Sequence, residues 1–334
     1  MSEPVADGRA LVEVRDLHKV FQGRRVFGKQ AEDVHAVQGV SFSVPAGGSL
    51  GIVGESGSGK TTVARMLVGS ERPTSGSVLL AGQEIAWSGA KSERLRQSRV
   101  VQMVFQDPYT SLDPRQSLRA AVDEVQRVHF ARDRAARRAR TTELFEAVGL
   151  GAREMRALPR ELSGGQRQRA AIARALAAEP RVVVLDEALS ALDVSVQAQI
   201  LNLLADLREQ FELTYVLISH DLAVVRQLSN DVLVMYRGQV MESGPIESVL
   251  AAPAHPYTQR LLASIPRAGM PLRQRSARVT EASGGCPFRT RCPRADERCA
   301  EPPPAYALSP THSAHCWHLD PDDAAEAVPA SYLP

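Results

Sequence analysis

A short run of residues from Ser49 to Thr62 constrains the fold of this 334-residue chain more than any other feature. It reads as a strand, a glycine-rich loop and a helix start, and it contains the spacing G-x-x-x-x-G-K-[ST] from Gly54 to Thr61. Glycines let the backbone take positive φ and turn its N–H groups toward phosphate oxygens, and the helix N-terminus adds a favourable dipole. The pattern predicts a phosphate-binding loop, or P-loop.

Two side chains of the P-loop have a predicted chemical role. The chain has only four lysines among its forty basic residues, and one of them, Lys60, is placed to contact β- and γ-phosphates. The hydroxyl of Thr61 is placed to ligate Mg²⁺. The residues expected to bind nucleotide here are Gly54, Glu55, Ser56, Gly57, Ser58, Gly59, Lys60, Thr61 and Thr62.

A second strand supplies the acidic residues that phosphate chemistry needs. Residues 182–185 are apolar, which predicts a buried central strand, and Asp186 follows at its carboxyl end, where ligands bind in open α/β sheets. Asp186 can hold a hydrated Mg²⁺, and Glu187 can polarise an attacking water. The sequence has no N-K-x-D element for reading guanine, which favours ATP over GTP.

Short β-branched runs alternate with helical stretches before residue 250, which predicts an α/β domain with a largely parallel sheet. Residues 11–14 and 40–44 instead mix apolar and polar side chains, as expected for an antiparallel layer, so the core is predicted to be mixed. The predicted strands are 49–53, 182–185 and 215–219. The helices that follow them are predicted to begin at about Gly59, Ser195 and Asp221, respectively.

Two further regions differ from this alternation. Strand signals vanish over about 106–162, which predicts a helical subdomain. Thirteen of the twenty-one prolines lie from Pro253 onward, which predicts a loop-rich C-terminal module. The expected division is a nucleotide-binding domain over 1–250 and a C-terminal extension over 251–334.

Composition excludes several classes of protein. Forty basic against thirty-eight acidic residues give a formal net charge of +2, and because no block is strongly basic we expect no nucleic-acid partner. The apolar runs are too short to cross a membrane, which needs ~20 residues. The N-terminal residues have neither a basic nor an apolar signal region, so we expect a cytosolic location.

The segment Leu162-Ser-Gly-Gly-Gln166, followed by an alanine-rich helix and lying between the P-loop and Asp186, makes the chain resemble an ABC-transporter ATPase subunit. Gly164 and Gly165 place bare N–H groups at a helix start, which is a second anion-binding site. The resemblance covers about residues 10–265. It implies that two ATPase domains pair head to tail, with each ATP between one P-loop and the other subunit's signature segment.

The resemblance also implies roles for single residues. Ser163, Gly164, Gly165 and Gln166 would contact the γ-phosphate of ATP held by the partner. Gln106 would sense Mg²⁺ and the water, and His220 would contact the γ-phosphate. Phe21 would stack on adenine, with a role in the core as the less favoured alternative. For His220 the less favoured alternative is a helix cap.

Three segments make the chain similar to the peptide and nickel uptake group of ABC transporters: residues 104–115, residues 191–204, and His255-Pro-Tyr-Thr258. That similarity implies two transmembrane permease subunits, an extracytoplasmic substrate-binding protein and a peripheral position on the cytoplasmic face of the inner membrane. The extra residues 22–35 imply a heterodimer with a second ATPase. Nickel or another solute as cargo, a soluble ABC-type ATPase and a non-hydrolytic regulatory module remain alternatives.

The four cysteines all lie in the final 49 residues, at Cys286, Cys292, Cys299 and Cys316. Five, six and sixteen residues separate neighbours, unlike the C-x₂₋₄-C pairs usual in zinc fingers. Four thiolates suit either a [4Fe–4S] cluster or Zn²⁺, with free or disulfide-bonded thiols as a third possibility. The family resemblance favours the cluster. Three nearby histidines are left out of this predicted site: His312, His315 and His318.

Overall fold

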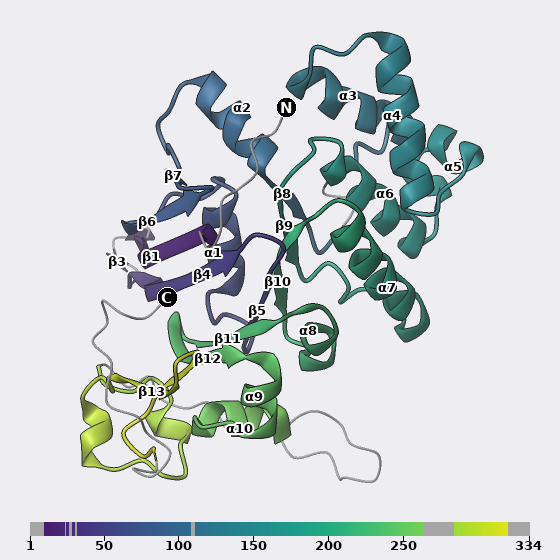
Figure 1. Cartoon of the computed structure of the whole chain (residues 1–334). Coiled ribbons are helices and arrows are strands. Elements are labelled where there is room, and N and C mark those ends of the chain that lie inside the picture. Colours follow the sequence, from purple (N-terminus) through teal and green to yellow (C-terminus); the bar gives the residue numbers. More distant parts are fainter. Residues whose placement is uncertain are drawn as a thin grey trace.

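The computed structural model describes residues 10–23, 25–26, 29–30, 32–107, 111–263 and 284–319. Four features used above lie partly or wholly outside these residues: the N-terminus, the extra segment 22–35, the segment 104–115 and the C-terminal extension 251–334. Figure 1 shows an antiparallel layer beside a larger sheet, a group of helices at one end and the C-terminal module at the other.

The larger sheet has eight strands in the order β13-β14-β12-β11-β5-β10-β9-β8. Its strands β8, β9, β10, β5 and β11 pair in parallel, whereas β12, β14 and β13 add an antiparallel edge. Every residue of β5, β9 and β10 is buried, as their apolar sequences predict. The bounds are β5 Ser49–Val53, β8 Val101–Val104, β9 Val182–Asp186, β10 Thr214–Ser219, β11 Asp231–Tyr236, β12 Gln239–Pro245, β13 Ala305–Ser309 and β14 His312–His315.

A four-stranded antiparallel layer, ordered β4-β1-β6-β7, packs on this sheet. Helix α1 (Lys60–Leu67) lies between the two, because its apolar residues share one core with both. The mixed core with an antiparallel layer is therefore confirmed. The strand bounds are β1 Ala10–Phe21, β4 Val34–Pro45, β6 Ser75–Leu80 and β7 Gln83–Glu84, and a small hairpin pairs β2 (Arg25–Val26) with β3 (Lys29–Gln30).

Helices form the predicted subdomain, and residues 111–162 contain no strand. The helices there are α3 (Leu118–His129), α4 (Arg134–Ala147) and α5 (Ala152–Arg156), followed by the 3₁₀ turn η2 (Pro159–Glu161). Helix α2 (Lys91–Val100), which the sequence analysis did not predict, stands before them and buries none of its residues. The helices that follow the core strands are α6 Gly164–Leu176, α7 Val194–Gln210 and α8 Leu222–Leu228.

The C-terminal residues are joined to the core more closely than an appended loop-rich module would be. Strand β14 pairs with β12, so β13 and β14 extend the main sheet. Glu242 of β12 is fully buried and accepts a hydrogen bond from His312 of β14 at 2.9 Å. The division at residue 250 stays a prediction. The remaining elements are α9 Ile246–Ala251, α10 Pro256–Ala263, η3 Arg289–Arg291 and η4 Glu297–Ala300.

Candidate active site

The P-loop joins β5 to α1, and glycine is required where it passes other backbone segments. Gly54 has φ of 154°, and a Cβ there would lie 2.1 Å from the carbonyl oxygen of Met235. Gly59 has φ of 99°, and a Cβ there would lie 2.2 Å from the carbonyl oxygen of Ala36. The left-handed backbone and these close approaches explain why the loop uses glycine, and both follow from the predicted motif.

Lys60 is buried, and its ammonium group folds back onto the loop. It donates to the carbonyl oxygens of Gly54 and Glu55 at 2.8 and 2.9 Å. Burial lowers the pKa of Lys60, and the carboxylates of Glu187 and Asp186 partly oppose that effect. The buried Lys60 amine thus lies within electrostatic range of the two acidic residues predicted for the site.

Thr61 and Asp186 come together, as a shared Mg²⁺ site requires. The hydroxyl of Thr61 donates to Oδ1 of Asp186 at 3.1 Å, across 125 residues of sequence. Burial raises the pKa of Asp186, while this hydrogen bond acts in the opposite direction. Hard oxygen donors on a buried carboxylate and a hydroxyl fit the preference of Mg²⁺, so the residues suit that ion.

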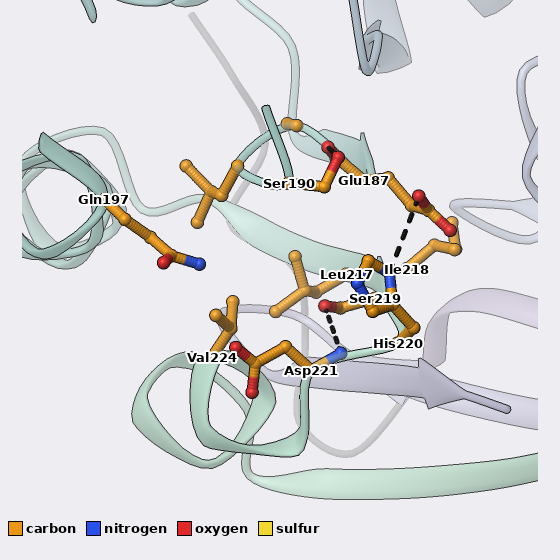
Figure 2. Close-up of a pocket in the computed structure, with 11 residues that line it drawn as sticks. Glu187, Ser190, Gln197, Leu217, Ile218, Ser219, His220, Asp221 and Val224 are labelled. Atoms are coloured by element: carbon orange, nitrogen blue, oxygen red, sulfur yellow. Dashed lines mark hydrogen bonds and ion pairs between the residues drawn. The ribbon is translucent and has the colours of Figure 1, made fainter. Parts of the chain in front are cut away.

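Glu187 follows directly after β9 and has a left-handed backbone, with φ of 46°. Its N–H donates to the carbonyl oxygen of Ile218 at 2.9 Å, which fixes the turn against β10. Its carboxylate lies 3.6 Å from Nδ1 of His220, as the dashed line in Figure 2 marks. A non-glycine residue held at positive φ costs energy and is frequent at functional sites.

A cavity of about 120 Å³ opens beside Glu187 and His220. Its lining includes Ser190, Gln197 and Asp221 together with apolar side chains of β10 and α8, as Figure 2 shows. Gln106 approaches the same region, because its amide donates to Oγ of Ser190 at 3.4 Å. Gln106, Glu187 and His220 are therefore brought to one neighbourhood; their roles stay predictions.

The signature segment forms the N-terminus of α6. Ser163 caps the helix, since its Oγ accepts from the N–H of Gln166 at 3.3 Å and the Gln166 side chain accepts from the N–H of Ser163 at 3.0 Å. Gly165 packs so closely on α7 that a Cβ would lie 2.6 Å from Val196. These bonds lie within the segment, and its contact with a second subunit's nucleotide stays a prediction.

Phe21 ends β1 rather than standing in a free loop, and it pairs with Val34. Its ring is 39% exposed, with the ammonium of Lys19 at 4.9 Å from the centroid. An exposed ring at the end of a strand is open to stacking, which stays a prediction.

The four cysteines gather in the C-terminal module, and none of them forms a disulfide. Burial raises the pKa of the Cys286 thiol to about 11, and the other three thiols raise it further, so all four lie near one another. Burial likewise raises the pKa of Cys292 and of Cys316. Four sulfur donors are the ligands that soft metal ions prefer, and they bind as thiolates, so the chemistry of the donor set fits a soft metal site.

His318, which is left out of the predicted cysteine site, lies beside one of the cysteines and an aspartate. Its Nε2 lies 3.7 Å from Sγ of Cys299 and 3.4 Å from Oδ1 of Asp296. Among the described residues these three form the one group of candidate ligands whose donor atoms all lie within 4.8 Å of one another. No pattern of sequence spacing links Asp296 to His318, so only the fold reveals the group.

Two residues at the P-loop were not predicted. Tyr257, part of the quoted His255-Pro-Tyr-Thr258 segment, accepts a hydrogen bond from the N–H of Glu55 at 2.9 Å. Arg291 holds the Glu55 carboxylate with two hydrogen bonds of 2.7 and 2.8 Å. The only sequence signal for Arg291 is its position before Cys292.

Comparison with known proteins defines the class first. The family model for ABC transporters matches residues 37–190. The solved structure of cbiO1 from Clostridium perfringens, part of an ABC transporter complex, superposes with a TM-score of 0.62 at 26% identity, over 72% of this chain and 91% of that one. The ATP-binding cassette MJ0796, in a dimeric post-hydrolysis state with ADP and Pi, also gives 0.62 at 27% identity, over 70% and 98%. The chain is an ATP-binding ABC transport ATPase.

The relatives then define the family within that class. The di/tripeptide transport ATP-binding protein DppF of Pseudomonas aeruginosa is 43% identical over 93% of this chain and 98% of its own length. The oligopeptide transport ATP-binding protein AppF of Bacillus subtilis is 44% identical over 94% and 98%. The family model for the C-terminal region of oligopeptide/dipeptide transporters matches residues 241–299. The chain belongs to the family of oligopeptide and dipeptide transport ATP-binding proteins. None of its described helices has the length and apolarity that a membrane span requires.

Proposed function

We propose that this chain hydrolyses ATP to power the import of oligopeptides or dipeptides through a membrane permease, as one half of an ATPase heterodimer. The observation that carries the ATPase part is the assembly of Lys60, Thr61, Asp186 and Glu187 from two strand ends. The peptide part rests on the relatives named above and on the matched C-terminal region. The second ATPase is inferred from the resemblance of residues 22–35.

The chain's own residues divide the work of hydrolysis. P-loop N–H groups and Lys60 receive the phosphates, and Thr61, Gln106 and Asp186 would hold Mg²⁺. When bound, Mg²⁺ neutralises charge on the phosphate oxygens. Glu187 takes a proton from the attacking water. His220, whose Nδ1 lies 3.6 Å from the carboxylate of Glu187, contacts the γ-phosphate. The N–H groups at the start of α6 face a partner's nucleotide in this proposal.

The proposed peptide cargo and the position at the membrane both follow from the proposal that the chain is an importer ATPase. Two permease subunits would bind the ATPase pair on the cytoplasmic face of the inner membrane, and an extracytoplasmic protein would deliver the peptide. The test is uptake of a radiolabelled dipeptide, a labelled oligopeptide and ⁶³Ni²⁺ by cells that lack the gene and carry either the wild-type chain or Glu187→Gln.

The proposal expects peptide uptake to be restored by the wild type and not by Glu187→Gln. Glu212→Gln is the matched control, because Glu212 also has positive φ, at 51°, but stands before β10 and away from the site. Uptake of nickel alone would replace the peptide assignment. Restored uptake by Glu187→Gln would contradict the ATP-driven mechanism.

We further propose that Cys286, Cys292, Cys299 and Cys316 hold a [4Fe–4S] cluster. Four thiolates are the ligand set that such clusters take, and the other three thiols lie close enough to Cys286 to raise its pKa. The preference for a cluster over Zn²⁺ rests on the resemblance to the peptide-transporter group. In this proposal the cluster joins segments of the module that no disulfide links.

The test is iron, sulfide and zinc content of the anaerobically purified full chain. The proposal expects about four irons and four sulfides, lost in Cys286→Ser and kept in His318→Gln. Full iron and sulfide in Cys286→Ser would refute it. One zinc, lost in His318→Gln, would assign the site to zinc with the histidine as a ligand.

A further inference from the structure

Glu55, a P-loop residue, is held on three sides. Its carbonyl oxygen accepts from Lys60 at 2.9 Å, which is a contact within the loop. Its other two polar groups are bound by the C-terminal part of the chain: the N–H by the hydroxyl of Tyr257 and the carboxylate by Arg291. Tyr257 and Arg291, 202 and 236 positions away in the sequence, therefore hold the P-loop from outside it. These two residues are called the brace below.

A buried cluster of aromatic rings fixes the side chains of the brace. Tyr257 is 1% exposed and Phe288 is fully buried, with their ring centroids 5.3 Å apart. Tyr236 packs on both rings, and its hydroxyl accepts a further hydrogen bond from Arg291 at 3.1 Å. Arg291 itself lies between Phe288 and Cys292 in the sequence, so the aromatic cluster and the cysteine module together fix its position.

The charge on Glu55 makes Arg291 necessary. The P-loop receives polyphosphate, and an unpaired carboxylate in that loop would repel it. Glu55 is close enough to Lys60 to influence its pKa. A bidentate arginine–carboxylate pair also fixes orientation, which a single contact does not.

We infer that Arg291 and Tyr257 are positioning residues for ATP, and that through Glu55 the cysteine module sets the nucleotide affinity of the P-loop. Backbone N–H groups bind phosphate best when they are ordered before the ligand arrives. The brace supplies that order and neutralises the carboxylate. The inference rests on the proposed ATP site and adds a second part of the chain to it.

The experiment measures the Kd of a fluorescent ATP analogue for the purified full chain. Arg291→Ala is expected to raise Kd about five- to tenfold, and Arg291→Lys by less, because lysine keeps the charge without the bidentate geometry. The KM for ATP is expected to rise with Kd, with a smaller change in kcat. Tyr257→Phe keeps the ring packing and removes only the acceptor, so it serves as a second variant and is expected to raise Kd about two- to fivefold.

A double-mutant cycle separates positioning from general damage. In the Glu55→Gln background, Arg291→Ala is expected to change Kd by less than about twofold, since its target is already neutral. Arg298→Ala is the matched control: Arg298 also precedes a cysteine and pairs with an aspartate, at 2.9 Å, but within the module itself. It is expected to leave Kd unchanged. Iron content and Tm are measured for every variant.

The outcomes distinguish the two proposals. A wild-type chain that binds no ATP overturns the proposed function. A wild type that binds ATP, with Arg291→Ala and Tyr257→Phe binding equally well, overturns only the brace. Equal losses of ATP affinity in Arg291→Ala and Arg298→Ala also overturn the brace, because they show that the module matters only for folding. Additive losses of affinity in the double-mutant cycle overturn it too, because they show that Arg291 does not act through Glu55.

Discussion

Replacing Glu187 with glutamine should separate ATP binding from ATP hydrolysis. The glutamine keeps the size of the side chain and one accepting oxygen, but it carries no charge and cannot act as a base. The backbone at this position is held by the Ile218 carbonyl and by the turn itself, so the substitution leaves the local geometry in place. Lys60 and the P-loop N–H groups, which bind the phosphates, are untouched.

The size of the effect follows from the role. A positioned general base contributes about 10²–10⁴-fold to a rate. At ~1.36 kcal/mol per factor of ten, this is a rise of about 3–5 kcal/mol in the activation free energy. The Kd for ATP should change by less than about threefold, because the lost charge does not hold a phosphate.

The assay is phosphate release by the purified full chain at saturating ATP, with Kd measured in parallel. Glu212→Gln makes the same chemical change at another left-handed glutamate and should hydrolyse ATP at the wild-type rate. Hydrolysis by Glu187→Gln within threefold of the wild type would remove Glu187 from the catalytic role. Loss of binding together with turnover would show that the residue supports the site rather than the chemistry.

Two further predictions concern buried groups. Lys60→Ala should weaken ATP binding about 10–100-fold, because a charge-assisted contact to phosphate is lost. Lys91→Ala, on the exposed start of α2, is the control. Unchanged ATP affinity in Lys60→Ala would contradict the P-loop assignment. Burial lowers the pKa of His255 to about 4, and its Nδ1 accepts the Tyr257 N–H at 2.9 Å, so the fold holds it neutral. Below the ordinary pKa of ~6.5 the unfolded chain binds a proton at His255 that the folded chain does not. The free energy of unfolding is therefore highest above pH ~6.5 and should fall by up to ~3 kcal/mol as the pH drops to about 4. Urea unfolding at pH 7.5 and 5 checks this: His255→Asn, which can still accept the N–H, should show a smaller loss, and an equal loss would refute the prediction.

The sequence predicted those parts of the site that depend on local order. The P-loop needs glycines at fixed spacing, and the strand before Asp186 is wholly apolar, so both were visible without a fold. The signature segment carries its own capping box between Ser163 and Gln166, which is a four-residue pattern.

The remaining features depend on contacts that no local pattern encodes. Strands β13 and β14 are short and form on the free edge of β12, where burial of Glu242 with His312 holds them. Helix α2 buries no residue, so no apolar periodicity marks it. The pairing of Glu55 with Arg291 spans 236 residues, and the left-handed backbone of Glu187 results from its bond to β10.

The most direct test of the central claim is affinity purification of the tagged chain from detergent-solubilised native membranes, followed by mass spectrometry. The account predicts two multi-spanning proteins and a second P-loop ATPase in the purified complex, with this assembly hydrolysing ATP. Recovery only from the soluble fraction, with ribosomal or DNA-bound proteins, would contradict the importer and leave the ATPase chemistry alone.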